Sequence, residues 1–135
     1  MANTYTIFIS HSWKYDSKYN DLRNLLDKRT YFSYEALEAT KNTPINSENA
    51  TYIKKVLKER IKNSNIVLAL AGIYASYSEW MKWEIDTALE LGIPIVGVAP
   101  WGQINLSQYV VNGAVEIVRW NTEPIVTAIR KHAKN

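Results

Sequence analysis

The residues best suited to chemistry in this chain are one acid and two tryptophans in the stretch from Ser78 to Ile85. Glu84 follows Trp80 by one helical turn, and Trp83 directly precedes the acid. Aromatic rings can bind a flat cationic heterocycle. A single carboxylate can stabilise the oxocarbenium-like centre that forms when a glycosidic bond breaks. The alternative is an acid that only caps neighbouring groups.

A second group of polar side chains follows the first apolar run. Ser10, His11 and Ser12 stand where the chain leaves that run. The imidazole could act as an acid or base, or contact a phosphate or a ribose. The two serines could bind phosphate or form a turn. For His11 the alternative is a loop residue that only hydrogen-bonds to backbone.

Helical geometry predicts how deeply the acid is buried. At about 100° per residue, four apolar side chains share the face that we expect to contact the core: Met81, Ile85, Ala88 and Leu89. Glu84 lies on the flank of that face, which predicts a boundary position, neither fully exposed nor fully buried. Partial burial beside indoles would raise the pKa of its carboxyl.

Composition excludes several kinds of protein and site. The 135 residues are 47% hydrophobic and 21% charged, which fits one domain over residues 1–135. No apolar run is long enough to cross a membrane and no signal sequence precedes the first run, so we expect a cytoplasmic protein. Without cysteine, and with two distant histidines, no metal site is expected. The glycine-rich phosphate loops of nucleotide-binding folds are also absent.

The charge pattern does not favour a nucleic-acid partner. The net charge is +3, and basic residues are interspersed with acids. The densest basic group falls in one predicted helix: Lys54, Lys55, Lys58, Arg60 and Lys62. A solvated helix face explains this group better than a nucleic-acid site, so no nucleic-acid contact is expected.

Apolar runs and periodic segments alternate along the chain. The patterns predict strands at 4–10, 31–36, 65–71, 93–99 and 115–120, with helices at 17–28, 49–62, 78–91 and 123–133. A long polar loop is predicted from Leu37 to Glu48. This alternation predicts a flavodoxin-like doubly wound α/β sheet of about five parallel strands in the order 2-1-3-4-5. Ligands bind such sheets where the order reverses, which here lies between strands one and three.

In several of the runs described above, the chain resembles a Toll/interleukin-1 receptor (TIR) domain. The run Phe8 to Ser12 is similar to the TIR first-strand motif, and the run Ile61 to Leu68 is similar to the approach to strand three. The run Ser78 to Ile85 resembles the motif S-x-W-C-x-x-E-L, with methionine for cysteine and isoleucine for leucine. Pro94-Ile95-Val96 resembles the strand-four motif. The resemblance spans nearly the whole chain and is closest to the prokaryotic Thoeris ThsB type.

The resemblance implies an activity and a set of site residues. Many prokaryotic TIR domains cleave the nicotinamide–ribose bond of NAD, and some cyclise the product into a signal for phage defence. Glu84 matches their catalytic glutamate. The other matched positions would bind the substrate: Ser10, His11, Ser12, Trp80 and Trp83. NAD is then a substrate, and no cofactor is implied.

The resemblance also implies partners. Enzymes of this kind commonly complete their site by self-association, and a diffusible product can reach a separate effector protein. The loop from Leu37 to Glu48 is unlike the usual TIR loop at this place. The alternative function is therefore a non-enzymatic adaptor or nucleotide-sensing module that acts by self-association. NAD turnover by the purified protein distinguishes the two.

Overall fold

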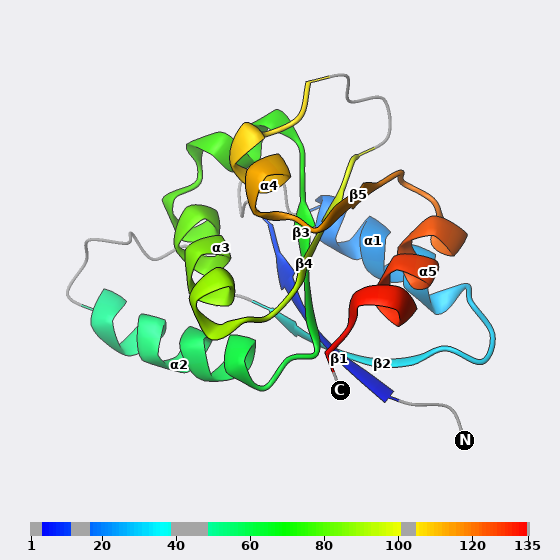
Figure 1. Ribbon diagram of the computed structural model, residues 1–135, viewed down its shortest axis with the longest axis horizontal. Coiled ribbons are helices and arrows are strands. Elements are labelled where there is room, and N and C mark those ends of the chain that lie inside the picture. The colour runs from blue at the N-terminus through cyan, green and yellow to red at the C-terminus, as the bar shows by residue number, and fades with distance from the viewer. Residues whose placement is uncertain (1–3, 12–16, 39–48, 101–104, 135) are drawn as a thin grey trace.

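Five parallel strands form a sheet in the order β2-β1-β3-β4-β5 (Figure 1). The computed structural model describes residues 4–11, 17–38, 49–100 and 105–134. The strands are β1 (Thr4–Ser10), β2 (Ser33–Glu38), β3 (Ile66–Leu70), β4 (Ile95–Val98) and β5 (Glu116–Val118). The order reverses at β1, which pairs with β2 on one side and with β3 on the other. This confirms the predicted flavodoxin-like α/β fold and its strand order.

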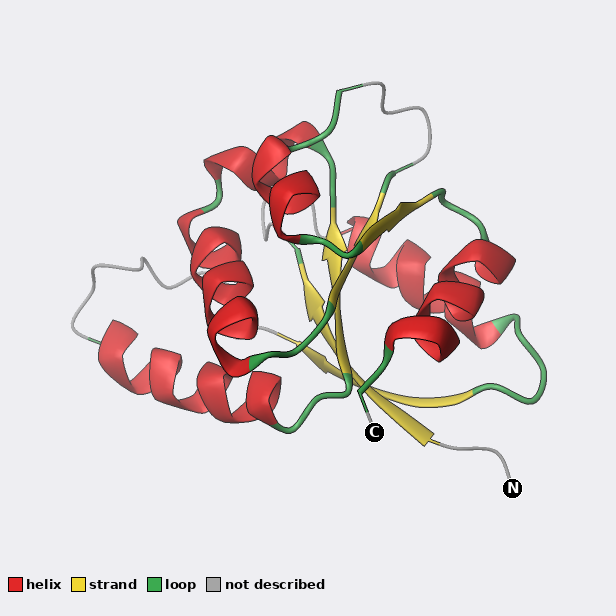
Figure 2. Cartoon of the chain, viewed as in Figure 1, coloured by secondary structure: helices red, strands yellow, loops and turns green. Residues whose placement is uncertain are grey.

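Helices cover both faces of the sheet (Figures 1 and 2). One face carries α2 (Ala50–Lys62), α3 (Glu79–Leu91) and the short α4 (Gln108–Gly113). The other face carries α1 (Ser17–Asp27) and α5 (Thr122–His132). A 3-10 helix, η2 (Ile73–Tyr77), joins β3 to α3. Within the described segments, no helix is long and apolar enough to cross a membrane.

The strands divide the core into two layers. Ile7 and Ile9 of β1 belong to the layer that contains α1 and α5. Phe8 belongs to the layer that contains α2 and α3. Side chains of a strand point alternately to opposite faces, so consecutive residues at the end of β1 are directed into different layers.

Helix α3 has well-defined ends that agree with its predicted span. The Ser78 hydroxyl accepts a hydrogen bond from the Met81 N–H at 3.2 Å, which is a standard N-cap. Gly92 ends the helix with a φ of 73°, a left-handed conformation in which a Cβ would be strained. These two residues fix where the helix begins and ends.

Some boundaries differ from the predicted ones. β2 begins at Ser33 and continues through Glu38, although we predicted a strand at 31–36 and a loop from Leu37. Tyr31 has a φ of 58° and is 89% exposed, so this aromatic residue lies in the turn before the strand. Residues 39–48 of the predicted loop lie outside the described residues. η2 was not predicted.

Candidate active site

A buried hydrogen bond joins the end of β1 to the middle of α3. The Ser10 hydroxyl donates to Oε1 of Glu84 at 2.7 Å. Ser10 is the last residue of β1 and is in register with Ala69 of β3, so the sheet fixes its position. Strand alternation directs its side chain into the same layer as Phe8, which is the layer that contains α3. The bond therefore lies at the carboxyl ends of the strands, where the strand order reverses.

The Glu84 side chain is fully buried, which corrects the predicted boundary position. Glu84 and Ser10 both have 0% exposure. Leu89, predicted to contact the core, is 53% exposed. The buried residues of α3 are Met81, Glu84, Ile85, Thr87 and Ala88. The carboxyl reaches Ser10 at the end of β1, so the Glu84 side chain is directed toward the sheet and not along the boundary.

Burial changes the protonation of the Glu84 carboxyl. Loss of water raises its pKa to about 8, and the hydrogen bond from Ser10 opposes part of that rise. Among the described residues, no cation contributes to the pKa of Glu84, and Oε2 has no hydrogen-bond partner. Burial of an ionised acid with a single hydrogen bond destabilises a fold, so Glu84 is a candidate for a functional group.

His11 faces the opposite layer from Ser10. Its ring stacks on Tyr19 of α1, with centroids 4.7 Å apart and ring planes at 29°. His11 is 2% exposed. Strand alternation explains why these consecutive residues separate. The predicted group of three is thus divided: Ser10 contacts the acid, His11 packs on α1, and Ser12 lies outside the described residues.

Trp80 and Trp83 form a half-buried pair in the first turns of α3. Their ring centroids are 5.9 Å apart and the planes meet at 83°, an edge-to-face arrangement. Both rings pack against the core layer that contains Met81. Since Trp80 precedes Glu84 by one helical turn, the indole and the acid are neighbours along the helix. The structure therefore joins an acid and a hydroxyl at the carboxyl edge of the sheet, and the same helix carries the pair of indoles.

Sequence reasoning missed the contact between Ser10 and Glu84. It assigned Ser10 to substrate binding or to a turn. The period of two in β1 was the available signal, because it places Ser10 on the face of Phe8 and His11 on the face of Ile9. That signal does not give the rotation of α3, which decides whether the carboxyl reaches the serine.

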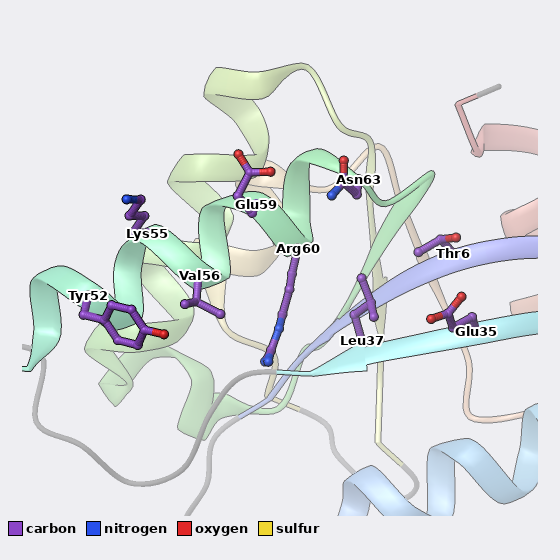
Figure 3. A pocket seen from close by; sticks show the side chains of 9 residues that line it. All are labelled: Thr6, Glu35, Leu37, Tyr52, Lys55, Val56, Glu59, Arg60 and Asn63. Carbon is purple, nitrogen blue, oxygen red and sulfur yellow. The ribbon is translucent and has the colours of Figure 1, made fainter.

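A groove among the described residues lies apart from this site (Figure 3). It has a volume of about 670 Å³ and runs between α2 and the edge of the sheet formed by β1 and β2. Its lining consists of Thr6, Glu35, Leu37, Tyr52, Lys55, Val56, Glu59, Arg60 and Asn63. The lining contains two acids, Glu35 and Glu59, and two bases, Lys55 and Arg60, so its formal charges cancel. The groove contains none of the predicted site residues and adds no group to the site.

A comparison with family models identifies the family of this chain. Residues 8–105 match the model described as Thoeris protein ThsB, TIR-like domain. The match covers more than half of the chain and includes Ser10, Trp80 and Glu84. The chain belongs to the Thoeris ThsB TIR-like family. This confirms the resemblance seen in the sequence and is consistent with a TIR-type defence protein. A search of curated proteins found no match for this ThsB-family chain.

Solved structures share the fold of the ThsB-family chain. The TIR domains of the activated Roq1 resistosome have a TM-score of 0.52 at 19% identity, over 70% of this chain and 57% of that one. A conserved protein from Enterococcus faecalis V583 has a TM-score of 0.63 at 12% identity, over 96% and 99%. A 2-deoxyribosyltransferase from Bacillus psychrosaccharolyticus has a TM-score of 0.57 at 18% identity, over 85% and 87%. At these identities the similarity shows the fold alone.

Proposed function

We propose that this ThsB-family chain consumes NAD, breaking the nicotinamide–ribose bond as an NAD glycohydrolase or ADP-ribosyl cyclase. The observation that carries the proposal is the fully buried Glu84 carboxyl, held by Ser10 where the strand order reverses. No cation among the described residues balances this acid. Unfavourable positions of this kind are retained where a titratable group does chemistry.

Cleavage of NAD moves positive charge from the nicotinamide ring to the ribose. The bond between ribose C1′ and the ring nitrogen breaks, and its electron pair stays with nicotinamide, which leaves as a neutral molecule. The ribose then carries an oxocarbenium-like charge. An ionised Glu84 would stabilise that charge strongly, because a buried site has a low dielectric. Attack by water, with loss of a proton, gives ADP-ribose, and attack by a nucleophile within the same molecule gives a cyclic product.

The surrounding residues would bind the rest of the nucleotide. The indoles of Trp80 and Trp83 would stack on nicotinamide or adenine. Because Glu84 has 0% exposure in the single chain, NAD can react only after the carboxyl becomes accessible. Self-association would provide that change. A nucleotide product would then carry the signal to a separate effector protein in antiphage defence.

Incubation of the purified chain with NAD tests this function directly. Chromatography and mass spectrometry should detect nicotinamide together with an equal molar amount of ADP-ribose or of a cyclic ADP-ribose, which contains one molecule of water less. The reaction should be run over a range of protein concentrations, with and without an extract of phage-infected cells as activator. If no nicotinamide forms under any of these conditions, the non-enzymatic adaptor becomes the better explanation.

A further inference from the structure

We infer that Ser10 is a positioning residue that holds one oxygen of Glu84 and leaves the other oxygen to meet the ribose. The inference rests on the proposed cleavage of NAD. It gives Ser10 a different role from the substrate contact predicted from the sequence. The two carboxyl oxygens have different surroundings: Oε1 accepts from the Ser10 hydroxyl at 2.7 Å, whereas Oε2 has no hydrogen-bond partner among the described residues.

The sheet makes Ser10 a rigid donor. Its own backbone is in register with Ala69, and the preceding Ile9 is in register with Glu38 on one side and Leu68 on the other. The serine side chain is short and fully buried, so it has little freedom to move. The last torsion of a glutamate side chain is broad when nothing holds it. One hydrogen bond to Oε1 therefore fixes the plane of the carboxyl and the direction of Oε2.

Nearby ionisable groups are occupied elsewhere. On α3, Lys82 lies over the ring of Tyr109 and Asp86 accepts a hydrogen bond from the Tyr109 hydroxyl. His11 stacks on Tyr19 in the other layer. Among the described residues of α2, α4 and the sheet, no charged side chain contributes to the pKa of Glu84. The Ser10 hydrogen bond is thus the contact that favours the ionised carboxyl against burial.

Three variants test this role. Ser10→Ala removes the hydroxyl and Ser10→Thr keeps it. Ser64→Ala is the matched control, since Ser64 is 4% exposed and its hydroxyl donates at 2.7 Å to the Arg60 carbonyl oxygen in α2. Thermal melting establishes that each variant is folded. The pKa of Glu84 is then measured by ¹³C NMR of its carboxyl, and kcat and KM for NAD are measured as a function of pH.

For Ser10→Ala we expect a higher pKa of Glu84 and a fall in kcat of about 10- to 100-fold, since the hydrogen bond is made to a charged group. KM should change by less than ~2-fold, because the substrate contacts remain. Ser10→Thr should recover most of kcat, and Ser64→Ala should change neither kcat nor the pKa of Glu84. If the threonine variant unfolds, the alanine variant and the control decide whether Ser10 positions Glu84.

Two results would overturn the inference. One is an unchanged pKa of Glu84 in Ser10→Ala. The other is a rise in KM with kcat unchanged, which would make Ser10 a substrate contact. The carboxyl titration needs no turnover, so a failure of the proposed function can be distinguished from a failure of the role of Ser10. A parent chain that never cleaves NAD refutes the proposed function, and the catalytic role of Ser10 with it. A parent chain that cleaves NAD, with no response to Ser10→Ala, refutes the role of Ser10 alone.

Discussion

Glu84 occupies a position in which a neutral side chain of the same shape would be more favourable. Its pKa is about 8 in the folded chain, against an ordinary value of 4.5, because the carboxyl is fully buried. Between these two pH values the folded chain keeps a proton that the unfolded chain has lost. The contribution of Glu84 to stability therefore falls as the pH rises from about 4.5 to about 8, and stays low above that.

Glu84→Gln should remove this part of the pH dependence. An amide cannot ionise, so the variant should have a higher free energy of unfolding than the parent at pH 8. The free energy of unfolding should increase by roughly 2–4 kcal/mol, after allowing for an amide N–H without a hydrogen-bond partner. Denaturant unfolding at several pH values measures it, with the exposed Glu90→Gln as control. A variant that is less stable than the parent at pH 8 would show that the carboxyl supports the fold.

The same titration should appear in the kinetics. The pH dependence of kcat/KM reports the essential groups of the free enzyme. Because the ionised carboxyl is required in the proposed reaction, kcat/KM should rise with pH, and it should level off above about 8 where the carboxyl stays shielded from water until NAD binds. Initial rates of nicotinamide release on both sides of that pH provide the test. An acid limb at the ordinary glutamate pKa of 4.5 would mean that the reacting carboxyl is exposed to water.

Helix α3 carries both core residues and proposed substrate contacts, and substitution should separate them. Met81 is 1% exposed, so Met81→Ala should lower stability by about 2–5 kcal/mol. Trp80 is half-buried, and Trp80→Ala should lower stability less while raising the KM for NAD. Thermal melting and steady-state kinetics give both quantities. A larger loss of melting temperature for Trp80→Ala than for Met81→Ala, with KM unchanged, would assign the indole to the core.

The sequence was sufficient to predict the five strands, the four longer helices and their order, because apolar periodicity reports which face of each element is buried. The predicted span of 78–91 also agrees with the observed ends of α3 at Ser78 and Gly92. The start of β2 was placed two residues early because Tyr31 and Phe32 look like strand residues, although Tyr31 has a left-handed conformation that belongs to a turn.

The site was predicted less completely than the fold. Its candidate residues were proposed from the sequence and from the family resemblance, but the burial of Glu84 was not predicted. Burial depends on how α3 is rotated against the sheet and its other neighbours, and a helical projection contains no information about these neighbours. For the same reason Leu89 was expected in the core and is exposed. The separation of Ser10 from His11 follows from strand alternation and could have been predicted.

The fold of the whole chain does not decide its activity, because the same architecture occurs in a TIR-containing resistosome and in a deoxyribosyltransferase. The single chain also encloses the carboxyl that the proposed reaction requires. We therefore expect that assembly of several copies opens or completes the site. Specific activity should rise steeply with protein concentration, since association follows mass action.

Two measurements on the same dilution series test the role of assembly. Light scattering gives the oligomeric state, and nicotinamide release gives the specific activity. Both should increase over the same concentration range. Specific activity that stays constant from a dilute monomer to a concentrated solution would show that one chain contains a complete and accessible site.

The most direct test of the proposed function is nicotinamide release by Glu84→Gln compared with the parent chain. Both proteins should be folded, at equal concentration, and assayed under the condition that gives the parent its highest rate. The parent should release nicotinamide from NAD, and the variant should release none above the uncatalysed background, because glutamine cannot carry the negative charge that stabilises the ribose cation. Equal rates in the two proteins would exclude Glu84 from the reaction and contradict the proposed mechanism.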